Sequence, residues 1–91
     1  MTSAAAAADC FSEAAALVKD QADLPRLEVV SPIDRPPYCI TLETIMAFAG
    51  RMKAHVARCP ASDHAHSVTE WDQTRTDYAK LFSKHRCRRT L

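Results

Sequence analysis

The chain has 91 residues, with 12 Lys and Arg against 11 Asp and Glu, four Cys and a single Gly. A chain of this length forms one small domain that hides roughly 60–65% of the surface its unfolded form exposes, so its core is marginal and a cross-link or a partner is expected. The near-neutral charge argues against a dedicated nucleic-acid-binding protein. Glycine-rich phosphate loops, dinucleotide-binding motifs and the glycine-containing hairpins of small β-proteins all need several glycines. The chain has only one, so the sequence excludes these features.

No apolar run approaches the roughly 18 residues that a transmembrane helix needs, because the longest runs, residues 4–8 and 45–49, are far shorter. The sequence therefore predicts a soluble or peripheral protein without a membrane span. The N-terminal residues lack a basic region, and Asp9 and Glu13 stand where targeting peptides avoid acid. We therefore expect no cleaved targeting peptide.

Residues 3–19 are rich in alanine and favour a helix, with Phe11, Ala15 and Val18 on one stripe. The segment has few large apolar groups, so this helix depends on docking against another element. A partly disordered N-terminal tail is the alternative.

Residues 20–38 hold four of the five prolines and predict an extended, ordered connector lying over a helical surface. Residues 28–30 have strand-like composition, but no second run offers a pairing partner. We divide the chain into an N-terminal helix with a proline-rich arm, residues 1–38, and a helical hairpin, residues 39–91.

A second helix is predicted over residues 41–57, with Thr41 as its N-cap. Its apolar residues recur at helical spacing, at Ile45, Phe48, Met52 and Val56. Gly50 inside this helix costs about 1 kcal/mol relative to Ala, and a close approach between helices is the expected compensation.

A third helix begins at a capping box in which Ser67 and Glu70 satisfy each other's backbone groups. Its apolar stripe comprises Trp71, Tyr78, Leu81 and Phe82. The short connection over residues 59–66 folds the second and third helices into an antiparallel hairpin. The predicted fold is all-α: a disulfide-stapled helical hairpin preceded by an N-terminal helix and a proline-rich extended connector.

The four cysteines can be ranked by geometry. Cys39 and Cys59 flank one helix and lie about 30 Å apart, far beyond the reach of a disulfide. An antiparallel hairpin instead brings Cys39 to Cys87, and closing this loop of about 49 residues stabilises the fold by about 4 kcal/mol. Four reduced cysteines in a cytosolic protein are the alternative. With the bridge, an oxidising compartment follows, and without a secretory signal that compartment is the mitochondrial intermembrane space.

A basic run follows the third helix, with the candidate partner-binding residues Lys84, Arg86, Arg88 and Arg89. It is expected to meet an acidic protein surface or anionic lipid head groups, and the alternative is a solvated helix end that complements the helix dipole. Nucleic acid is not expected as a partner.

Metal-dependent or catalytic chemistry is not expected. Cys59 with His64 and His66 would need a fourth zinc ligand, and exposed loop histidines are the simpler interpretation. His85 and Cys87 stand two positions apart, which points them about 200° from each other on a helix. We therefore predict no catalytic residue, no metal site and no cofactor, and the chain is not expected to be an enzyme.

The segment CPASDHAHSVTEWDQTRTDYAKLFSKHRC, residues 59–87, resembles the helical hairpin of the hinge-protein family of the mitochondrial cytochrome bc1 complex. The likeness lies in the spacing from Cys59 to Ser67-x-Thr69-Glu70-x-Asp72-x-Thr74 and in the helix that ends at Cys87. It implies two antiparallel helices joined by two disulfides, the outer one corresponding to Cys39 with Cys87.

The resemblance also implies a function. It predicts a non-catalytic accessory subunit of complex III, supporting electron transport from ubiquinol to cytochrome c in the respiratory chain. Such a subunit is peripheral, on the intermembrane-space side of the mitochondrial inner membrane, with cytochrome c1 as its partner. A small helical adaptor, or an accessory subunit of another respiratory or cytosolic assembly, is the alternative.

The chain departs from the family in two ways. Gln73 stands where the family has the partner of its inner disulfide, which leaves Cys59 unpaired or bonded to Cys10. The acidic N-terminal tract of the family is missing. Residues 1–38 carry three basic and six acidic side chains, a net −3, and residues 39–91 carry nine and five, a net +4, together giving +1. We therefore expect no electrostatic steering of cytochrome c.

Overall fold

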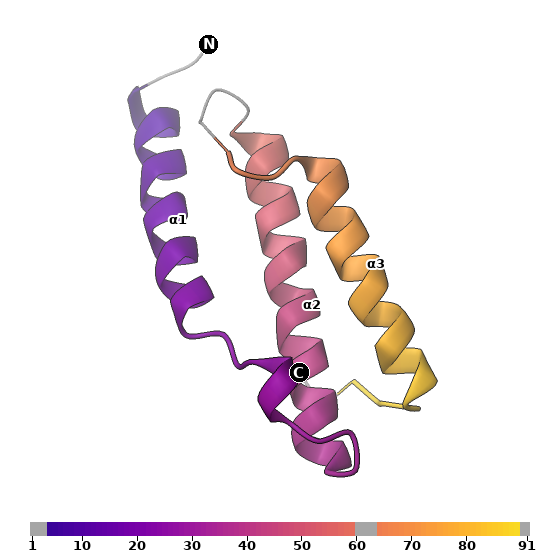
Figure 1. The fold of residues 1–91 in the computed structure, drawn as a ribbon. Coiled ribbons are helices and arrows are strands. Elements are labelled where there is room, and N and C mark those ends of the chain that lie inside the picture. The colour runs from indigo at the N-terminus through magenta and orange to yellow at the C-terminus, as the bar shows by residue number, and fades with distance from the viewer. Residues whose placement is uncertain (1–3, 60–63, 90–91) are drawn as a thin grey trace.

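The structure is a computed structural model that describes residues 4–59 and 64–89, with side chains from residue 9 onward. Its elements are helix α1 (Ala4–Ala22), the short 3-10 helix η1 (Leu27–Val29), helix α2 (Arg35–Arg58) and helix α3 (Val68–Lys84). The chain runs along α1, returns along α2 and reverses again along α3 (Figure 1). The all-α prediction is confirmed for the described residues.

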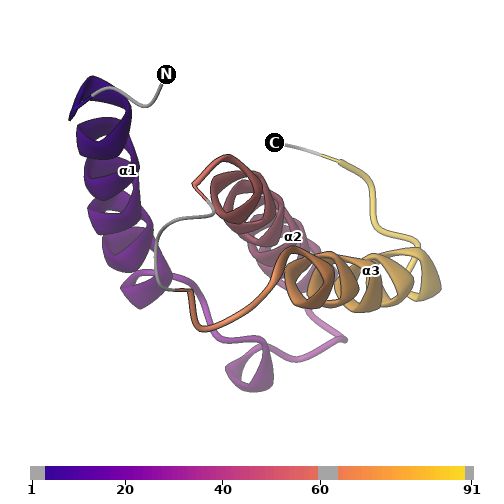
Figure 2. The ribbon, with the colours of Figure 1, turned by 90° about the horizontal axis from the view of Figure 1, so that it is seen from above.

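The three long helices form an open layer with α2 in the middle. Helices α1 and α3 flank α2, as the two perpendicular views show (Figures 1 and 2), and in the described parts of the chain their backbones do not come close to each other. The molecule measures 50 × 22 × 22 Å, with a radius of gyration of 15.0 Å. A compact chain of this length has a radius of gyration of about 12 Å, so the layer is elongated.

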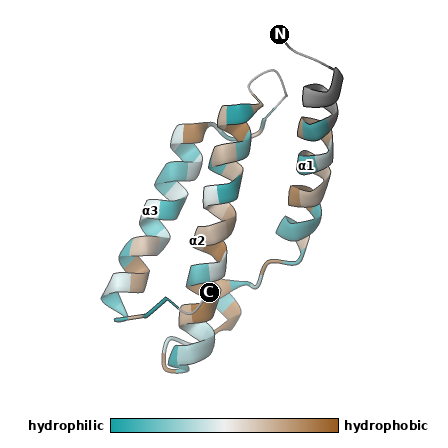
Figure 3. Cartoon of the chain, turned by 180° about the vertical axis from the view of Figure 1, so that it is seen from behind, coloured by the Kyte–Doolittle hydropathy of each residue, from teal (hydrophilic) through white to brown (hydrophobic). Residues whose placement is uncertain are grey.

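The buried apolar side chains lie almost entirely on α2, with Leu42 fully buried. The other buried apolar side chains are Leu17 of α1 and Tyr38, Phe48, Ala49, Val56 and Cys59. Helix α3 covers this face with half-buried side chains, among them Trp71, whose ring meets the Phe48 ring edge-on at 5.9 Å. Figure 3 shows hydrophobic residues recurring along α2, whereas the first turns of α3 are mostly hydrophilic.

Helix α2 begins earlier than its apolar pattern predicts. It starts at Arg35, after the N-cap Asp34, and not at Thr41. Pro36 and Pro37, which indicated an extended connector, occupy its first turn, where backbone N–H groups have no intrahelical acceptor and a proline costs nothing. Cys39 therefore lies inside the helix, in its second turn.

The other predicted elements stand close to their expected positions. Helix α1 extends to Ala22, three residues beyond the predicted end; Ser3, the predicted start, lies outside the described residues. The connector is ordered through η1, which packs on α2.

The capping box at the start of α3 is confirmed, because the Glu70 N–H donates to Ser67 Oγ at 3.1 Å and the Ser67 N–H donates to Glu70 Oε1 at 3.0 Å. Residues 60–63 of the predicted connection lie outside the described residues.

Two disulfides join the helices. The predicted Cys39–Cys87 bond is present, with the Cα atoms 5.5 Å apart, and it ties the start of α2 to the end of α3. The second bond joins Cys10 of α1 to Cys59, directly after α2, with a Cα separation of 6.0 Å. All four cysteines are thus paired, and the alternative of reduced thiols is not what the structure shows.

Across residues 4–59 and 64–89, no helix combines the length and the apolar character needed to cross a bilayer.

Gly50 does not mark a close approach between helices. A methyl group placed on its Cα would have Arg75 Cδ of α3 as its nearest neighbour, at 3.9 Å, which is ordinary van der Waals contact. The prediction that a close approach between helices compensates for Gly50 is therefore wrong. The backbone freedom of this glycine lowers the stability of the helix, and no closer packing offsets the loss.

We predict that Gly50→Ala raises the free energy of unfolding by about 0.5–1 kcal/mol, because alanine removes backbone entropy from the unfolded chain and fits the site. Urea unfolding followed by circular dichroism measures the change. The matched control is Ala47→Gly, at an exposed position of the same helix, which lowers the free energy by a similar amount. A destabilised Gly50→Ala protein would show that the α2–α3 interface has no room for a methyl group.

Each disulfide should hold a different helix. Replacing Cys10 and Cys59 by Ser is expected to raise amide hydrogen exchange along α1, because the non-covalent contacts of α1 with α2 are few. Replacing Cys39 and Cys87 by Ser should instead raise exchange at the end of α3. Each double variant loses about 4 kcal/mol of unfolding free energy in the chain-entropy model. Equal exchange changes in α1 and α3 for both variants would contradict this division.

Candidate functional site

A basic hollow surrounds the Cys39–Cys87 disulfide where α2 begins and α3 ends. It has a volume of about 320 Å³ and brings together three guanidinium groups with an exposed aliphatic side chain. We call it the basic crevice, lined by Arg35, Pro36, Cys39, Ile40, Arg86, Cys87 and Arg88. Ile40 is 45% exposed there, so the crevice offers apolar as well as cationic contact.

The chain leaves α3 through a tight turn that shapes this crevice. The Cys87 N–H donates to the Phe82 carbonyl and the Arg86 N–H to the Ser83 carbonyl, both at 3.0 Å, which is the Schellman pattern of a helix end. Arg86 takes the left-handed conformation, φ 55°, at the position where glycine is usual. This turn costs about 1 kcal/mol for a residue with a Cβ, and it directs Cys87 toward Cys39.

Arg35 holds the turn from the opposite helix. One of its guanidinium nitrogens donates to the Arg86 carbonyl at 2.9 Å and to the His85 carbonyl at 3.3 Å. The His85 ring also meets the Tyr38 ring edge-on at 4.8 Å. Sequence reasoning missed Arg35 because it placed this residue in the connector; once α2 starts at Arg35, the i,i+4 spacing to Cys39 puts both on one helix face.

The four predicted basic residues do not form one patch. Arg86 and Arg88 line the basic crevice, whereas Arg89 lines a second hollow of about 390 Å³ between α2 and α3, with Arg75. Lys84 is exposed in the last turn of α3. The residues that converge on one hollow are therefore Arg35, Arg86 and Arg88.

A second group of polar side chains lies where α1 meets α2. Glu13 of α1 accepts hydrogen bonds on Oε1 from His55 Nδ1 and from the Arg58 guanidinium, the latter at 2.6 Å. His55 is only 3% exposed, so this hydrogen bond is shielded from solvent on the histidine side. An ion pair between Arg51 and Asp20, 2.9 Å apart, supports the same two helices further along.

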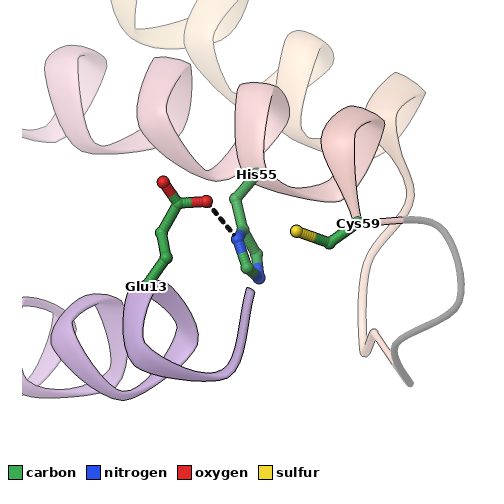
Figure 4. A group of neighbouring side chains, drawn as sticks. All are labelled: Glu13, His55 and Cys59. Atoms are coloured by element: carbon green, nitrogen blue, oxygen red, sulfur yellow. Dashed lines mark hydrogen bonds and ion pairs between the residues drawn. The ribbon is translucent and has the colours of Figure 1, made fainter. Parts of the chain in front are cut away.

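The Cys59 sulfur lies beside this pair. The sulfur, a carboxylate oxygen of Glu13 and an imidazole nitrogen of His55 all fall within 4.8 Å of one another (Figure 4). We call Cys10, Glu13, His55 and Cys59 the junction cluster, since Cys10 is bonded to Cys59. In the oxidised state its sulfurs are neither nucleophiles nor metal ligands, because both roles require a thiolate.

The zinc-ligand set considered from sequence, Cys59 with His64 and His66, does not assemble. His64 Nε2 donates to the Cys59 carbonyl at 2.7 Å, and His66 contacts Glu70 at 3.3 Å. Sequence reasoning missed Glu13 and His55, although the signal was present: each stands three or four positions from a cysteine, on the same helix face.

The carboxyl group of Glu13 titrates below its ordinary range. The hydrogen bond from His55, and then that from Arg58, hold the pKa of Glu13 below its usual value of 4.5. The contact with Lys53, followed by that with Arg75, likewise lowers the pKa of Asp72. A group whose folded pKa is depressed stabilises the fold above its unfolded pKa, and this stabilisation is lost as the pH falls through the folded value.

Comparisons with known proteins found no relative. The chain matches no protein-family model, no curated protein and no solved structure.

We predict that Glu13→Gln weakens the attachment of α1 at neutral pH, because a neutral amide is a poorer acceptor for His55 and Arg58. The melting temperature should fall at pH 7. The difference from the unmodified chain should shrink as the pH drops below 4.5, the ordinary pKa of the carboxyl group, and vanish below the lower pKa that Glu13 has in the folded chain. Thermal melts between pH 3 and 7 measure this. Glu28→Gln, an exposed carboxylate on η1, is the control and should leave the profile unchanged. A pH-independent difference between Glu13→Gln and the unmodified chain would contradict the assignment.

Proposed function

We propose that the protein is a non-catalytic accessory subunit that docks on a larger protein assembly in an oxidising compartment. The assembly we propose is the mitochondrial cytochrome bc1 complex, with the chain on its intermembrane-space face against cytochrome c1. The observation that carries the docking role is the exposed apolar face of α1 that carries Phe11 and Val18.

This face presents large apolar groups to solvent. Phe11 is 79% exposed and Val18 is 68% exposed, and a spacing of seven residues puts both on one side of the helix. The connector adds Val29 and Ile33, also exposed. The whole chain exposes 6552 Å², whereas a compact monomer of this mass exposes roughly 5,300 Å². An excess of this kind is typical of a chain that buries more surface in an assembly.

The two disulfides support both the compartment and the mechanism. Disulfides persist in oxidising compartments and are rare in the cytosol. They also fix α1 and α3 against α2 before any partner is bound, so little conformational entropy is lost on docking. The mechanism is passive: helix faces supply buried area, and electron transfer belongs to neighbouring subunits.

The basic crevice adds a charged contact. Arg35, Arg86 and Arg88 suit an acidic protein surface, for which guanidinium groups provide paired hydrogen bonds to carboxylates. The crevice surrounds the disulfide that corresponds, by resemblance, to the outer bond of the hinge-protein family. The Cys10–Cys59 bond differs from that family, in which both bonds join the same two helices. The proposal therefore assigns the additional contact surface to α1.

A tagged chain isolated under mild detergent and separated on a native gel tests the proposal. We expect it to migrate with a large complex that contains the haem c1 subunit. Phe11→Asp should reduce this co-migration at least about tenfold, because it places a charge in the apolar contact, while the neighbouring exposed Ser12→Asp should not.

Arg86→Glu with Arg88→Glu should weaken the association further at low salt, with Lys80→Glu on the exposed part of α3 as control. A complex without the haem c1 subunit would reject the bc1 assignment, and a chain that migrates alone would reject the role of accessory subunit.

A further inference from the structure

The junction cluster consists of two pairs of side chains, one from each of two antiparallel helices. Cys10 and Glu13 stand three positions apart on α1, and His55 and Cys59 stand four positions apart at the end of α2. These spacings turn both members of a pair to the same face. Sulfur, imidazole and carboxylate atoms from Cys59, His55 and Glu13 already lie within 4.8 Å of one another, and the Cys10 sulfur is bonded to that of Cys59 (Figure 4).

These four groups are the ligand types that Zn²⁺ takes in proteins: thiolate sulfur, imidazole nitrogen and carboxylate oxygen. Bonds of 2.0–2.3 Å in a tetrahedral site place ligand atoms roughly 3.3–3.8 Å apart. Since the three atoms lie within 4.8 Å of one another, no pair has to close by more than about 1.5 Å. His55 Nδ1 and Glu13 Oε1, now joined by a short hydrogen bond, have to move apart, and the two sulfurs have to separate once their bond is broken. The disulfide already holds the Cα atoms of Cys10 and Cys59 at 6.0 Å.

We propose that, when the Cys10–Cys59 disulfide is reduced, Cys10, Cys59, His55 and Glu13 bind one Zn²⁺ ion that replaces the disulfide as the cross-link between α1 and α2. The proposal rests on this geometry and not on the function proposed above.

The charges around the junction cluster suit a divalent cation. Two thiolates and the Glu13 carboxylate carry three negative charges, which Zn²⁺ and the neighbouring Arg58 guanidinium neutralise together. Neutrality matters here because His55 and Cys59 are each only 3% exposed, and an unbalanced charge at such depth is costly. Arg58 holds one Glu13 oxygen by a hydrogen bond, and His64 holds the Cys59 carbonyl. Such outer hydrogen bonds orient metal ligands.

The exchange between the two cross-links balances chemically. A dithiol reductant transfers two electrons and two protons to the disulfide, becoming a cyclic disulfide itself and leaving two cysteine thiols. Zn²⁺ then displaces the two thiol protons to solvent as the metal–sulfur bonds form. The disulfide and the zinc site exclude each other, because each uses the same two sulfurs. Every newly made chain passes through the reduced state before its cysteines are oxidised.

The test begins with the full chain reduced by a dithiol, freed of reductant without oxygen and titrated with Co²⁺ and then Zn²⁺. We expect one metal ion per chain, thiolate-to-cobalt absorption, and release of protons on binding. Cys39→Ser with Cys87→Ser should keep the site, and Cys10→Ser with Cys59→Ser should abolish it. The oxidised chain should bind no metal at the junction cluster.

His55 distinguishes this site from a pair of thiolates alone. His55→Ala should weaken zinc binding at least about 100-fold, since loss of even an outer-shell partner costs 10–100-fold. His66→Ala, a nearby exposed histidine, is the matched control and should bind normally. Equal affinity of His55→Ala and the unmodified chain would overturn the proposal.

A second variant avoids reductant altogether, in case full reduction unfolds the chain. Cys10→Ser leaves Cys59 as a free thiol while Cys39–Cys87 stays oxidised, so the hairpin is retained. It should bind Co²⁺ through one thiolate, more weakly than the reduced chain, and lose this binding with His55→Ala. A folded Cys10→Ser protein without cobalt–thiolate absorption would also overturn the proposal.

Discussion

Covalent bonds at the two ends of α2 are the constraint on which the other helices depend. Cys39, near the start of this helix, ties it to the end of α3, and Cys59, just after its last residue, ties it to α1. The buried apolar side chains belong almost entirely to α2; α1 adds Leu17, and α3 covers the core with half-buried side chains. For a chain of 91 residues, each bond stabilises the fold by about 4 kcal/mol, a large part of the total stability of so small a domain.

Helix α1 is attached by polar and covalent contacts more than by apolar ones. Leu17 is its one buried apolar side chain in the described residues, and the carboxylate of Glu13 reaches across to the buried imidazole of His55. Phe11 and Val18 of the same helix stay largely exposed, and Val18 borders a hollow shared with α2. A helix fixed by a few strong contacts can present its exposed apolar side chains to a partner without changing its conformation on binding.

The sequence predicts most of the hairpin because local signals and chain geometry agree there. The capping box fixes the start of α3, and an antiparallel hairpin leaves Cys39 only one distant partner. The sequence places the start of α2 six residues too late, because prolines in a first helical turn look the same in sequence as prolines in an extended connector. The sequence does not determine the pairing of Cys10, since the docking of α1 depends on tertiary contacts such as Glu13 with His55. Recognising that pair required the helices to be oriented first.

The order of the paired cysteines along the chain, 10 with 59 and 39 with 87, makes the two disulfide loops overlap. A single peptide-bond cleavage anywhere between the first and the last cysteine therefore leaves two pieces that remain linked by at least one bridge. Pairing of successive cysteines would instead release a fragment after a cut in the middle of α2. Proteolytic nicks in the connector thus leave α1 covalently joined to the molecule, and its release requires both a cut chain and a reduced Cys10–Cys59 bond.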